Sequence, residues 1–216
     1  MIIFKNREEA GGRLAEKLLE YKNQPKVIIL GVPRGGAAVG ASLAKKLNLP
    51  FDLIIPRKLP IPGNPEMGFG AILSDGTMFL NEPVVEAYGI TEEEISQVTC
   101  EVLEEVKRRE KEYRGKAGLP DVKDKIVILV DDGLATGFTM LAAIKAVKKA
   151  GAKEIIVAVP VSPEDSIKRV SPEVDELVCL YIQRGYRSFA VASFYEDFHD
   201  LTDEEVRYLV PPLKGA

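Results

Sequence analysis

Two adjacent carboxylates followed by small and hydroxyl residues are the part of this sequence best suited to chemistry. Asp131 and Asp132 follow an apolar run that is typical of a buried strand, and the residues after them are Gly-Leu-Ala-Thr-Gly-Phe-Thr. Open α/β sheets bind ligands at the carboxyl ends of their strands. Gly133 and Gly137 allow tight turns that expose backbone N–H groups at a helix start, which suits a phosphate. The carboxylates suit sugar hydroxyls or a magnesium shell.

Other phosphate-binding and acidic motifs fit this segment less well. A P-loop requires G-x-x-x-x-G-K-[ST], but Gly133 and Gly137 have the wrong spacing and no lysine follows them. No G-x-G-x-x-G fingerprint follows the strand either. Paired aspartates also occur at phosphoaspartate sites, where the downstream Thr-Gly-x-Thr would have no role. A capped turn with exposed aspartates is the plain alternative, and the repulsion between adjacent carboxylates disfavours it.

Two further segments carry groups that could bind an anion. Gly31 to Gly36 reads Gly-Val-Pro-Arg-Gly-Gly after an apolar run, so its glycines would let backbone N–H groups approach an anion. Arg34 in this loop supplies a planar fork for phosphate oxygens. Arg57 and Lys58 open residues 57–70, which hold three prolines and three glycines and therefore predict a long loop. A loop of this length is typical of a lid or a binding loop.

Strands and helices alternate along the chain, as a parallel sheet with covering helices requires. The pattern predicts strands at about 26–30, 51–55, 126–130, 154–159 and 176–181, and helices at about 6–22, 37–47, 91–114, 139–150, 164–170 and 202–209. A hairpin is expected at 71–80. We expect the charged run at 104–112 to be a solvated helix face with i,i+4 pairs.

Composition limits the function classes. The chain has 216 residues, 29 Lys+Arg and 33 Asp+Glu, which give a net charge of −4 and argue against extended nucleic-acid binding. No apolar run approaches the roughly 18 residues that a membrane-spanning helix needs, and no signal-peptide apolar region follows Met1. Cys100 and Cys179 lie outside any disulfide or zinc pattern. We therefore expect a cytoplasmic protein with no membrane partner.

Around Asp131 the sequence resembles the type I phosphoribosyltransferases. Val130 to Thr139 is similar to their 13-residue motif for binding 5-phosphoribosyl 1-diphosphate (PRPP), and the resemblance extends over most of the chain. It implies an α/β fold with an open, mostly parallel sheet flanked by helices, and a small hood built from the chain termini. We expect one domain over residues 1–216, with a core at about 26–182 and a flexible loop at about 57–70.

The resemblance also implies roles for these residues. Asp131 and Asp132 would bind the ribose 2′- and 3′-hydroxyls, and Arg57 and Lys58 would belong to the catalytic lid. The PRPP-binding segment would further contain Gly133 and the residues that wrap the 5′-phosphate, Ala135, Thr136, Gly137, Phe138 and Thr139. The diphosphate loop would comprise Pro33, Arg34, Gly35 and Gly36.

The implied reaction is displacement of magnesium diphosphate from C1′ by a nucleophile, usually a ring nitrogen. The transition state should resemble an oxocarbenium ion. Mg²⁺ and the basic groups Arg34, Arg57 and Lys58 would stabilise the charge that builds on the leaving group. Mg²⁺ is the expected cofactor, held mainly by PRPP, with Asp131 and Asp132 contributing through water.

The acceptor is not fixed by the sequence. The 6-oxopurine members carry an aspartate where this chain has Ala135, which puts a hypoxanthine, guanine or xanthine acceptor in doubt. Phe194 and Tyr195 are candidates for stacking on a base, and packing in the core is an equally good interpretation of both. His199, the one histidine, is flanked by acids and is expected to be a surface hydrogen-bonding residue.

Two alternatives to a base-modifying enzyme stay open. One is a regulatory protein that binds PRPP without turnover; the diphosphate loop and the Arg57-Lys58 lid favour the enzyme, because a sensor needs neither. The other is an enzyme whose acceptor is not a nucleobase. The resemblance also allows a homodimer.

Overall fold

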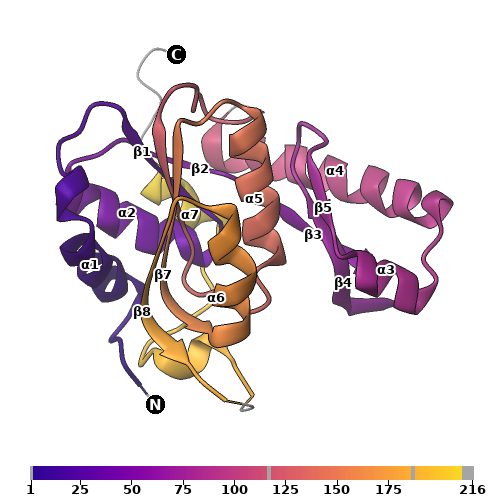
Figure 1. The fold of residues 1–216 in the computed structure, drawn as a ribbon. Coiled ribbons are helices and arrows are strands. Elements are labelled where there is room, and N and C mark those ends of the chain that lie inside the picture. Colours follow the sequence, from indigo (N-terminus) through magenta and orange to yellow (C-terminus); the bar gives the residue numbers. More distant parts are fainter. Residues whose placement is uncertain (1, 116–117, 186–187, 211–216) are drawn as a thin grey trace.

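A five-stranded parallel sheet forms the core of the molecule (Figure 1). The structure, a computed structural model, describes residues 2–115, 118–185 and 188–210. The strand order is β2-β1-β6-β7-β8, and every neighbouring pair runs parallel. The strands are β1 (Val27–Gly31), β2 (Phe51–Leu53), β6 (Ile126–Val130), β7 (Glu154–Pro163) and β8 (Glu176–Gln183).

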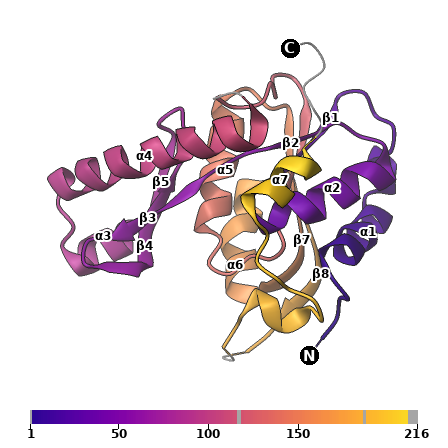
Figure 2. The same cartoon turned by 180° about the vertical axis from the view of Figure 1, so that it is seen from behind.

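Helices cover both faces of this sheet (Figure 2). Helices α1 (Arg7–Lys17) and α2 (Gly35–Leu47) lie on one face, and α5 (Phe138–Lys149) and α6 (Glu164–Val170) lie on the other. A short 3-10 turn at Leu19–Tyr21 follows α1. Successive residues of a strand face opposite sides, so alternate residues of β6 join the two apolar clusters. The predicted fold class, an open parallel sheet flanked by helices, is confirmed.

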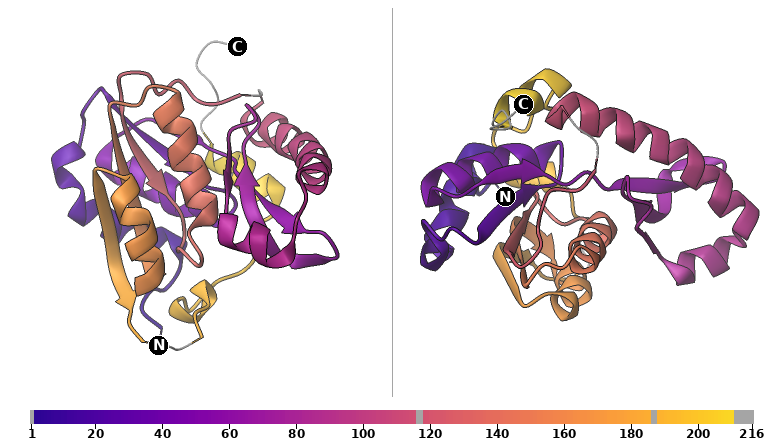
Figure 3. Two further views of the ribbon diagram at one scale, coloured as in Figure 1. Left: turned by 45° about the vertical axis from the view of Figure 1, so that its right-hand side comes forward. Right: turned by 90° about the horizontal axis from the view of Figure 1, so that it is seen from above.

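Residues 57–114 form a projection that we call the arm. It contains β3 (Arg57–Ile61), β4 (Asn64–Ile72) and β5 (Met78–Leu80) in an antiparallel sheet, with α3 (Glu82–Tyr88) and α4 (Glu92–Arg114). Seen from above, the arm extends away from the core (Figure 3). The hairpin expected at 71–80 is confirmed as the β4–β5 turn, whereas α3 was not predicted.

The prediction of a long irregular loop at 57–70 is wrong, because β3 and β4 pair across this segment. The strand pair contains the prolines and glycines of this segment at its turn and at an irregularity in its register. Pro62 and Gly63 form the tight turn, where Gly63 has φ +77, and Pro60 lies at an irregularity in the strand register opposite Gly68. Proline and glycine are tolerated at such turns and bulges.

Helix α4 joins the arm to the core. Thr91 and Glu94 form a capping box at its start. In its first half, Ile95 and Val98 pack, half-buried, against the apolar cluster of the arm strands. In its second half, Val106 and Tyr113 are buried with residues of β2 and of the C-terminal helix α7 (Asp203–Leu209). The second half of α4 is thus part of the core wall.

The segments near the two ends of the chain meet beside the sheet. Phe4 forms an isolated parallel bridge with Tyr195, and the Ile3 amide donates to the Phe194 carbonyl at 2.9 Å. The short helical turn Val191–Phe194 lies in this region. Within the described residues, none of the helices combines the length and the apolar character needed to cross a membrane.

Candidate active site

The register of the central strands brings the acidic pair beside the glycine loop. Gly31 at the end of β1 pairs with Val130 at the end of β6, so the loops after the two strands start side by side. A Cβ on Gly35 would lie 1.8 Å from Oδ2 of Asp132, and one on Gly36 would lie 2.5 Å from the Val130 carbonyl. Neither position has room for a side chain. The glycines of the predicted diphosphate loop are therefore required by the close approach of the acidic loop.

Asp132 is held by a buried arginine from the start of α1. The Arg7 Nε donates to Oδ2 of Asp132 at 2.8 Å, and Arg7 Nη1 donates to the His199 carbonyl at 2.8 Å. The guanidinium also lies 3.8 Å from the centre of the Phe198 ring. Sequence reasoning missed Arg7, because it is 125 residues from its partner and no local pattern links the two.

Burial governs the protonation of the acidic pair. Burial and the neighbouring Asp132 charge raise the pKa of Asp131 well above its ordinary value. Burial also raises the pKa of Asp132, and the charge of Arg7 opposes that rise. The Asp132 amide donates to Oδ1 of Asp131 at 2.8 Å. Arg7 is thus the group that favours the ionised form of Asp132 in a site where burial disfavours it.

The segment predicted to wrap the 5′-phosphate leads into α5. Gly137 is the residue before the helix, with φ +81, so the N–H groups of Phe138 and Thr139 belong to the first turn, whose donors have no acceptor within the helix. Helix α6 ties down the other side of the loop. Ser166 Oγ donates to the Ala135 carbonyl at 2.6 Å, and Arg169 donates to the Thr136 carbonyl.

Gly133 has a packing role in the structure. A Cβ on Gly133 would lie 2.8 Å from both methyl groups of Val191, so it lets the acidic loop pack against the C-terminal segment. The Ala135 and Thr136 side chains are exposed, as a loop that receives a ligand requires. A helix N-terminus with exposed small residues in front of it can hold an anion.

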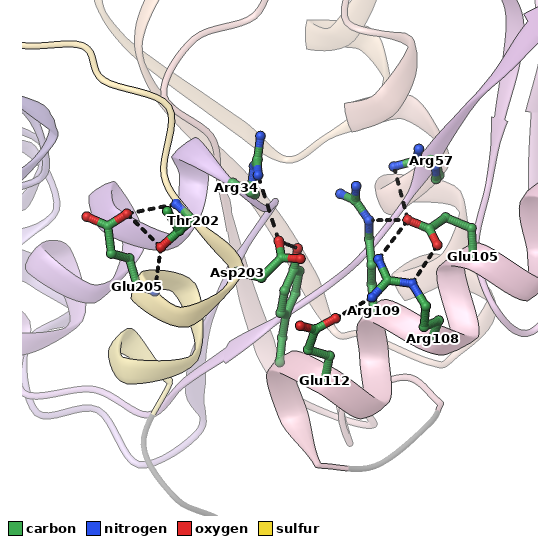
Figure 4. Close-up of polar contacts among 10 residues, drawn as sticks. Arg34, Arg57, Glu105, Arg108, Arg109, Glu112, Thr202, Asp203 and Glu205 are labelled. Carbon is green, nitrogen blue, oxygen red and sulfur yellow. Dashed lines mark hydrogen bonds and ion pairs between the residues drawn. The ribbon is translucent and has the colours of Figure 1, made fainter.

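Two of the three predicted basic residues lie near the junction of the arm and the core (Figure 4). Arg34 precedes α2 and its Nη1 lies 3.8 Å from Oδ1 of Asp203 in α7. Arg57 opens β3 and its Nη1 lies 4.0 Å from Oε1 of Glu105 in α4. Burial, followed by the charge of Arg109, lowers the pKa of Arg57. The peptide bond between Pro33 and Arg34 is cis.

Lys58 lies apart from Arg57 across the strand. Neighbouring residues of a strand point to opposite faces, and the Lys58 stem passes over Gly68, where a Cβ would lie 2.5 Å from its Cγ. The structure therefore does not bring Arg57 and Lys58 to one face as a joint lid pair. That expectation came from treating the segment as an irregular loop.

The two aromatic residues predicted to stack on a base are in the core. Phe194 and Tyr195 are each 4 % exposed, and their rings lie against those of Tyr181, Phe189, Phe4 and Phe198. The Tyr195 hydroxyl donates to the Asp132 carbonyl at 2.7 Å. Because their faces are covered by neighbouring rings, the structure contradicts their assignment as a stacking platform. Tyr195 supports the acidic loop instead.

His199 is an exposed hydrogen-bonding residue, as expected. Its ring nitrogens lie 3.1 Å from Oδ1 of Asp197 and 3.3 Å from Oε1 of Glu205. Hydrogen bonds to these two carboxylates raise the pKa of His199 above its ordinary value, and the bond to Asp197 has the larger effect. Through its carbonyl the same residue positions Arg7.

Comparisons with known proteins identify the family. The model of the family described as "Phosphoribosyl transferase domain" matches residues 3–193. Two Mycobacterium tuberculosis proteins, from strains CDC 1551 and H37Rv, carry the name phosphoribosyl transferase. Each is 37% identical to this chain over 207 residues. The match covers 95% of this chain but 46% of each relative, so the chain spans about half the length of these relatives.

The solved structures include one that is similar throughout. TT1426 from Thermus thermophilus is 32% identical, with a TM-score of 0.80, and the match covers 97% of this chain and 98% of TT1426. The AQ2163 protein from Aquifex aeolicus, at 14% identity and a TM-score of 0.52 over 82% of this chain and 74% of its own, shares the fold. With the family description matched over nearly the whole length, this chain belongs to the phosphoribosyl transferase family.

Proposed function

We propose that this protein is a phosphoribosyltransferase that uses magnesium-bound PRPP and transfers its 5-phosphoribosyl group to a nitrogenous acceptor, with release of diphosphate. The observation that carries this proposal is the contact between Asp132 and the glycine loop, where a Cβ on Gly35 would lie 1.8 Å from a carboxylate oxygen. The carboxylate proposed to bind the sugar and the loop proposed to bind the diphosphate are thereby adjacent, where β1 and β6 end. In PRPP the diphosphate is attached directly to the ribose, so the two groups that it presents are likewise adjacent.

Each part of the site has a task in this reaction. The Asp131 and Asp132 carboxylates would accept hydrogen bonds from the ribose hydroxyls and favour a ring that becomes cationic. The first turn of α5 would hold the 5′-phosphate. Arg34 and Arg57 would bind diphosphate oxygens and stabilise their growing charge as the bond to C1′ breaks. Neither aspartate acts as a nucleophile in this scheme.

Magnesium fits the residues present. Carboxylate oxygens are ligands that Mg²⁺ prefers, and Mg²⁺ usually retains several waters and binds substrate phosphates. Asp131 and Asp132 offer such oxygens at the end of β6. The ion would lower the charge of the leaving diphosphate. The carboxylates would accept hydrogen bonds from the waters bound to Mg²⁺ and would keep the ribose in a fixed position beside the ion.

The acceptor is proposed as a nucleobase, with Ala135 counting against 6-oxopurines. Ala135 is exposed but has a methyl side chain, so this position offers no carboxylate to a base nitrogen. Its backbone carbonyl already accepts a hydrogen bond from Ser166 Oγ. An acceptor that is not a base, and a regulator that binds PRPP without turnover, are the alternatives. A cytoplasmic location and a homodimer stay predictions.

An acceptor screen tests this function. The full chain is incubated with PRPP, Mg²⁺ and a panel of adenine, uracil, 6-oxopurines and simple amines, and released diphosphate is measured. We expect release that depends on both Mg²⁺ and one class of acceptor, with adenine or uracil above the 6-oxopurines. PRPP binding with no release for any acceptor would support the regulator. Failure to bind PRPP at all would contradict both.

A further inference from the structure

Helix α4 places one more arginine beside the proposed diphosphate site. Arg109 is on the half of α4 that forms the core wall, and its side chain is 22 % exposed. Its Nε donates to Oε1 of Glu105 at 2.9 Å, the same oxygen that lies 4.0 Å from Nη1 of Arg57. Arg109 and Arg57 therefore share one carboxylate oxygen. Figure 4 shows Arg109 between Arg34 and Arg57.

The residues of α4 that follow the arginine are held by buried polar contacts. Arg114 forms a two-bond pair with Asp52 of β2, at 2.7 and 2.9 Å, and its side chain is 1 % exposed. Glu110 is buried and accepts from Ser74 Oγ at 2.6 Å and from the Gly118 amide at 2.7 Å. Tyr113 is buried and donates to Asp203. Arg109 is therefore presented by a rigid element, which favours a defined binding geometry.

The Glu105 carboxylate is shared among three guanidinium groups, those of Arg57, Arg108 and Arg109. Arg108 already holds Glu105 with two hydrogen bonds, at 2.7 and 3.0 Å. Arg109 and Arg57 therefore face a carboxylate that is strongly paired elsewhere. On the core side, Oδ1 of Asp203 lies 3.8 Å from Arg34 Nη1 and also accepts a hydrogen bond from the neutral hydroxyl of Tyr113. A multiply charged anion could satisfy these guanidinium groups better than the shared carboxylates do.

We propose that Arg109 is a further diphosphate-binding residue, contributed by α4, and that the Glu105 carboxylate competes for Arg109 and Arg57 until the diphosphate of the substrate displaces it. This inference rests on the proposed function. It gives the site a cation from the arm helix in addition to Arg34 from the core loop and Arg57 from β3. Arg108 is excluded from this role, because its side chain is 52 % exposed and it also bonds Glu112.

Two neighbouring arginines on one helix provide a matched test. The dissociation constants of inorganic diphosphate with Mg²⁺ and of ribose 5-phosphate are measured by titration calorimetry for the full wild-type chain and its variants. Arg109→Gln should weaken diphosphate binding by roughly tenfold or more, the size of one lost charge-assisted hydrogen bond. Arg108→Gln, which also removes a partner of Glu105, should change it less than about twofold. Ribose 5-phosphate binding should be unchanged in both variants.

A change of opposite sign distinguishes ligand binding from a structural role. Glu105→Gln removes the competing carboxylate and should tighten diphosphate binding several-fold. If the cluster around Glu105 were purely structural, the same variant would bind diphosphate more weakly. Arg109→Lys keeps the charge without the planar fork and should lie between wild type and Arg109→Gln; it also serves if Arg109→Gln does not fold. Melting temperatures report folding.

Equal diphosphate affinities for Arg109→Gln and Arg108→Gln, or weaker binding by Glu105→Gln, would overturn the inference. The proposed function is tested separately by Arg34→Gln and Arg57→Gln, which should still weaken diphosphate binding in that case. A wild-type protein that binds neither PRPP nor diphosphate would overturn both.

Discussion

The two edges of the candidate site hold their charges in different ways. At the sugar edge, Arg7 and Asp132 are 2.8 Å apart with side chains 8 % and 14 % exposed. At the diphosphate edge, the Arg34–Asp203 and Arg57–Glu105 pairs are 3.8 and 4.0 Å apart, with all four side chains 30 % to 39 % exposed. The Arg7–Asp132 pair is thus short and buried, whereas the Arg34–Asp203 and Arg57–Glu105 pairs are longer and partly exposed.

This difference matches what each edge would have to do in phosphoribosyl transfer. The ribose stays bound through the chemical step, so rigid carboxylates in fixed positions serve it well. The diphosphate must be bound, stabilised as it departs and then released. Loose ion pairs at a partly exposed junction can exchange one anion for another at small cost. In the proposed reaction, the core would therefore supply a preformed ribose site, and the junction with the arm would supply cations that exchange one anion for another.

The sharpest way to break the sugar edge is to place a methyl group in it. In Gly35→Ala the new Cβ would lie 1.8 Å from Asp132 Oδ2, so the carboxylate or the loop must move by more than 1 Å. We expect the affinity for Mg²⁺-bound PRPP to fall by roughly 100-fold, the cost of such a displacement in a positioned site. Titration calorimetry measures it. Gly12→Ala in α1, whose Cβ would meet only the flexible end of Lys46, is the control and should bind normally.

Removing the buried counter-ion should have an effect of similar size, on stability rather than on binding. Arg7→Gln leaves the Asp132 carboxylate buried without its cation, and breaking a buried pair in this way should lower the free energy of unfolding by about 3 kcal/mol. Lys168→Gln removes the exposed Lys168–Glu164 pair at 3.2 Å and should cost less than about 0.5 kcal/mol. Chemical denaturation at neutral pH compares the two. Equal losses would show that the sugar edge is no tighter than an ordinary surface pair.

The diphosphate edge should give the smallest effect and a defined pH dependence. Hydrogen bonds from Arg108 and Arg109 lower the pKa of Glu105 to about 2 from its ordinary value of 4.5. A lowered pKa means that the folded state favours the carboxylate, so its stabilising effect is present above pH 4.5 and is lost as the pH falls toward 2. Wild type should exceed Glu105→Gln in stability by at most about 1 kcal/mol above about pH 5.

Denaturation of wild type and Glu105→Gln between pH 2 and neutral pH checks this sign. The difference between the two proteins should shrink as the solution is acidified. A difference that grows on acidification would mean that Glu105 is destabilising as a carboxylate, and the comparison between the two edges would fail.

Local signals in the sequence predicted much of the fold. The helices predicted at about 91–114, 164–170 and 202–209 match α4, α6 and α7. Each depends on a pattern within a few residues. The acidic loop after β6 and the glycine loop after β1 were predicted to share one site, and the register of Gly31 with Val130 places them side by side.

The errors arose where distant contacts decide the structure. Pro60 and Gly68 suggested a loop, but their segment pairs as strands because a turn at Gly63 and a register irregularity absorb them. The ring stacking proposed for Phe194 and Tyr195 could not be judged without knowing that other rings cover them.

Arg7 and Arg109 were missed for the same reason. Arg7 meets Asp132 only through the fold, and Arg109 lies in a run that resembles a solvated helix face. The i,i+4 pair of Arg109 with Glu105 is present as expected, and the nearby Arg57 comes from another element. Sequence periodicity does not contain that information.

Binding of Mg²⁺-bound PRPP to wild type and to the Asp131→Asn, Asp132→Asn double variant tests the account most directly. The neutral amides nearly preserve the shape of the pair and remove two charge-assisted acceptors for the ribose hydroxyls. We expect wild type to bind PRPP with one site per chain and the double variant to bind it at least roughly 100-fold more weakly, while remaining folded. Equal affinity in the two proteins, measured by titration calorimetry, would contradict the assignment of the acidic pair to the ribose.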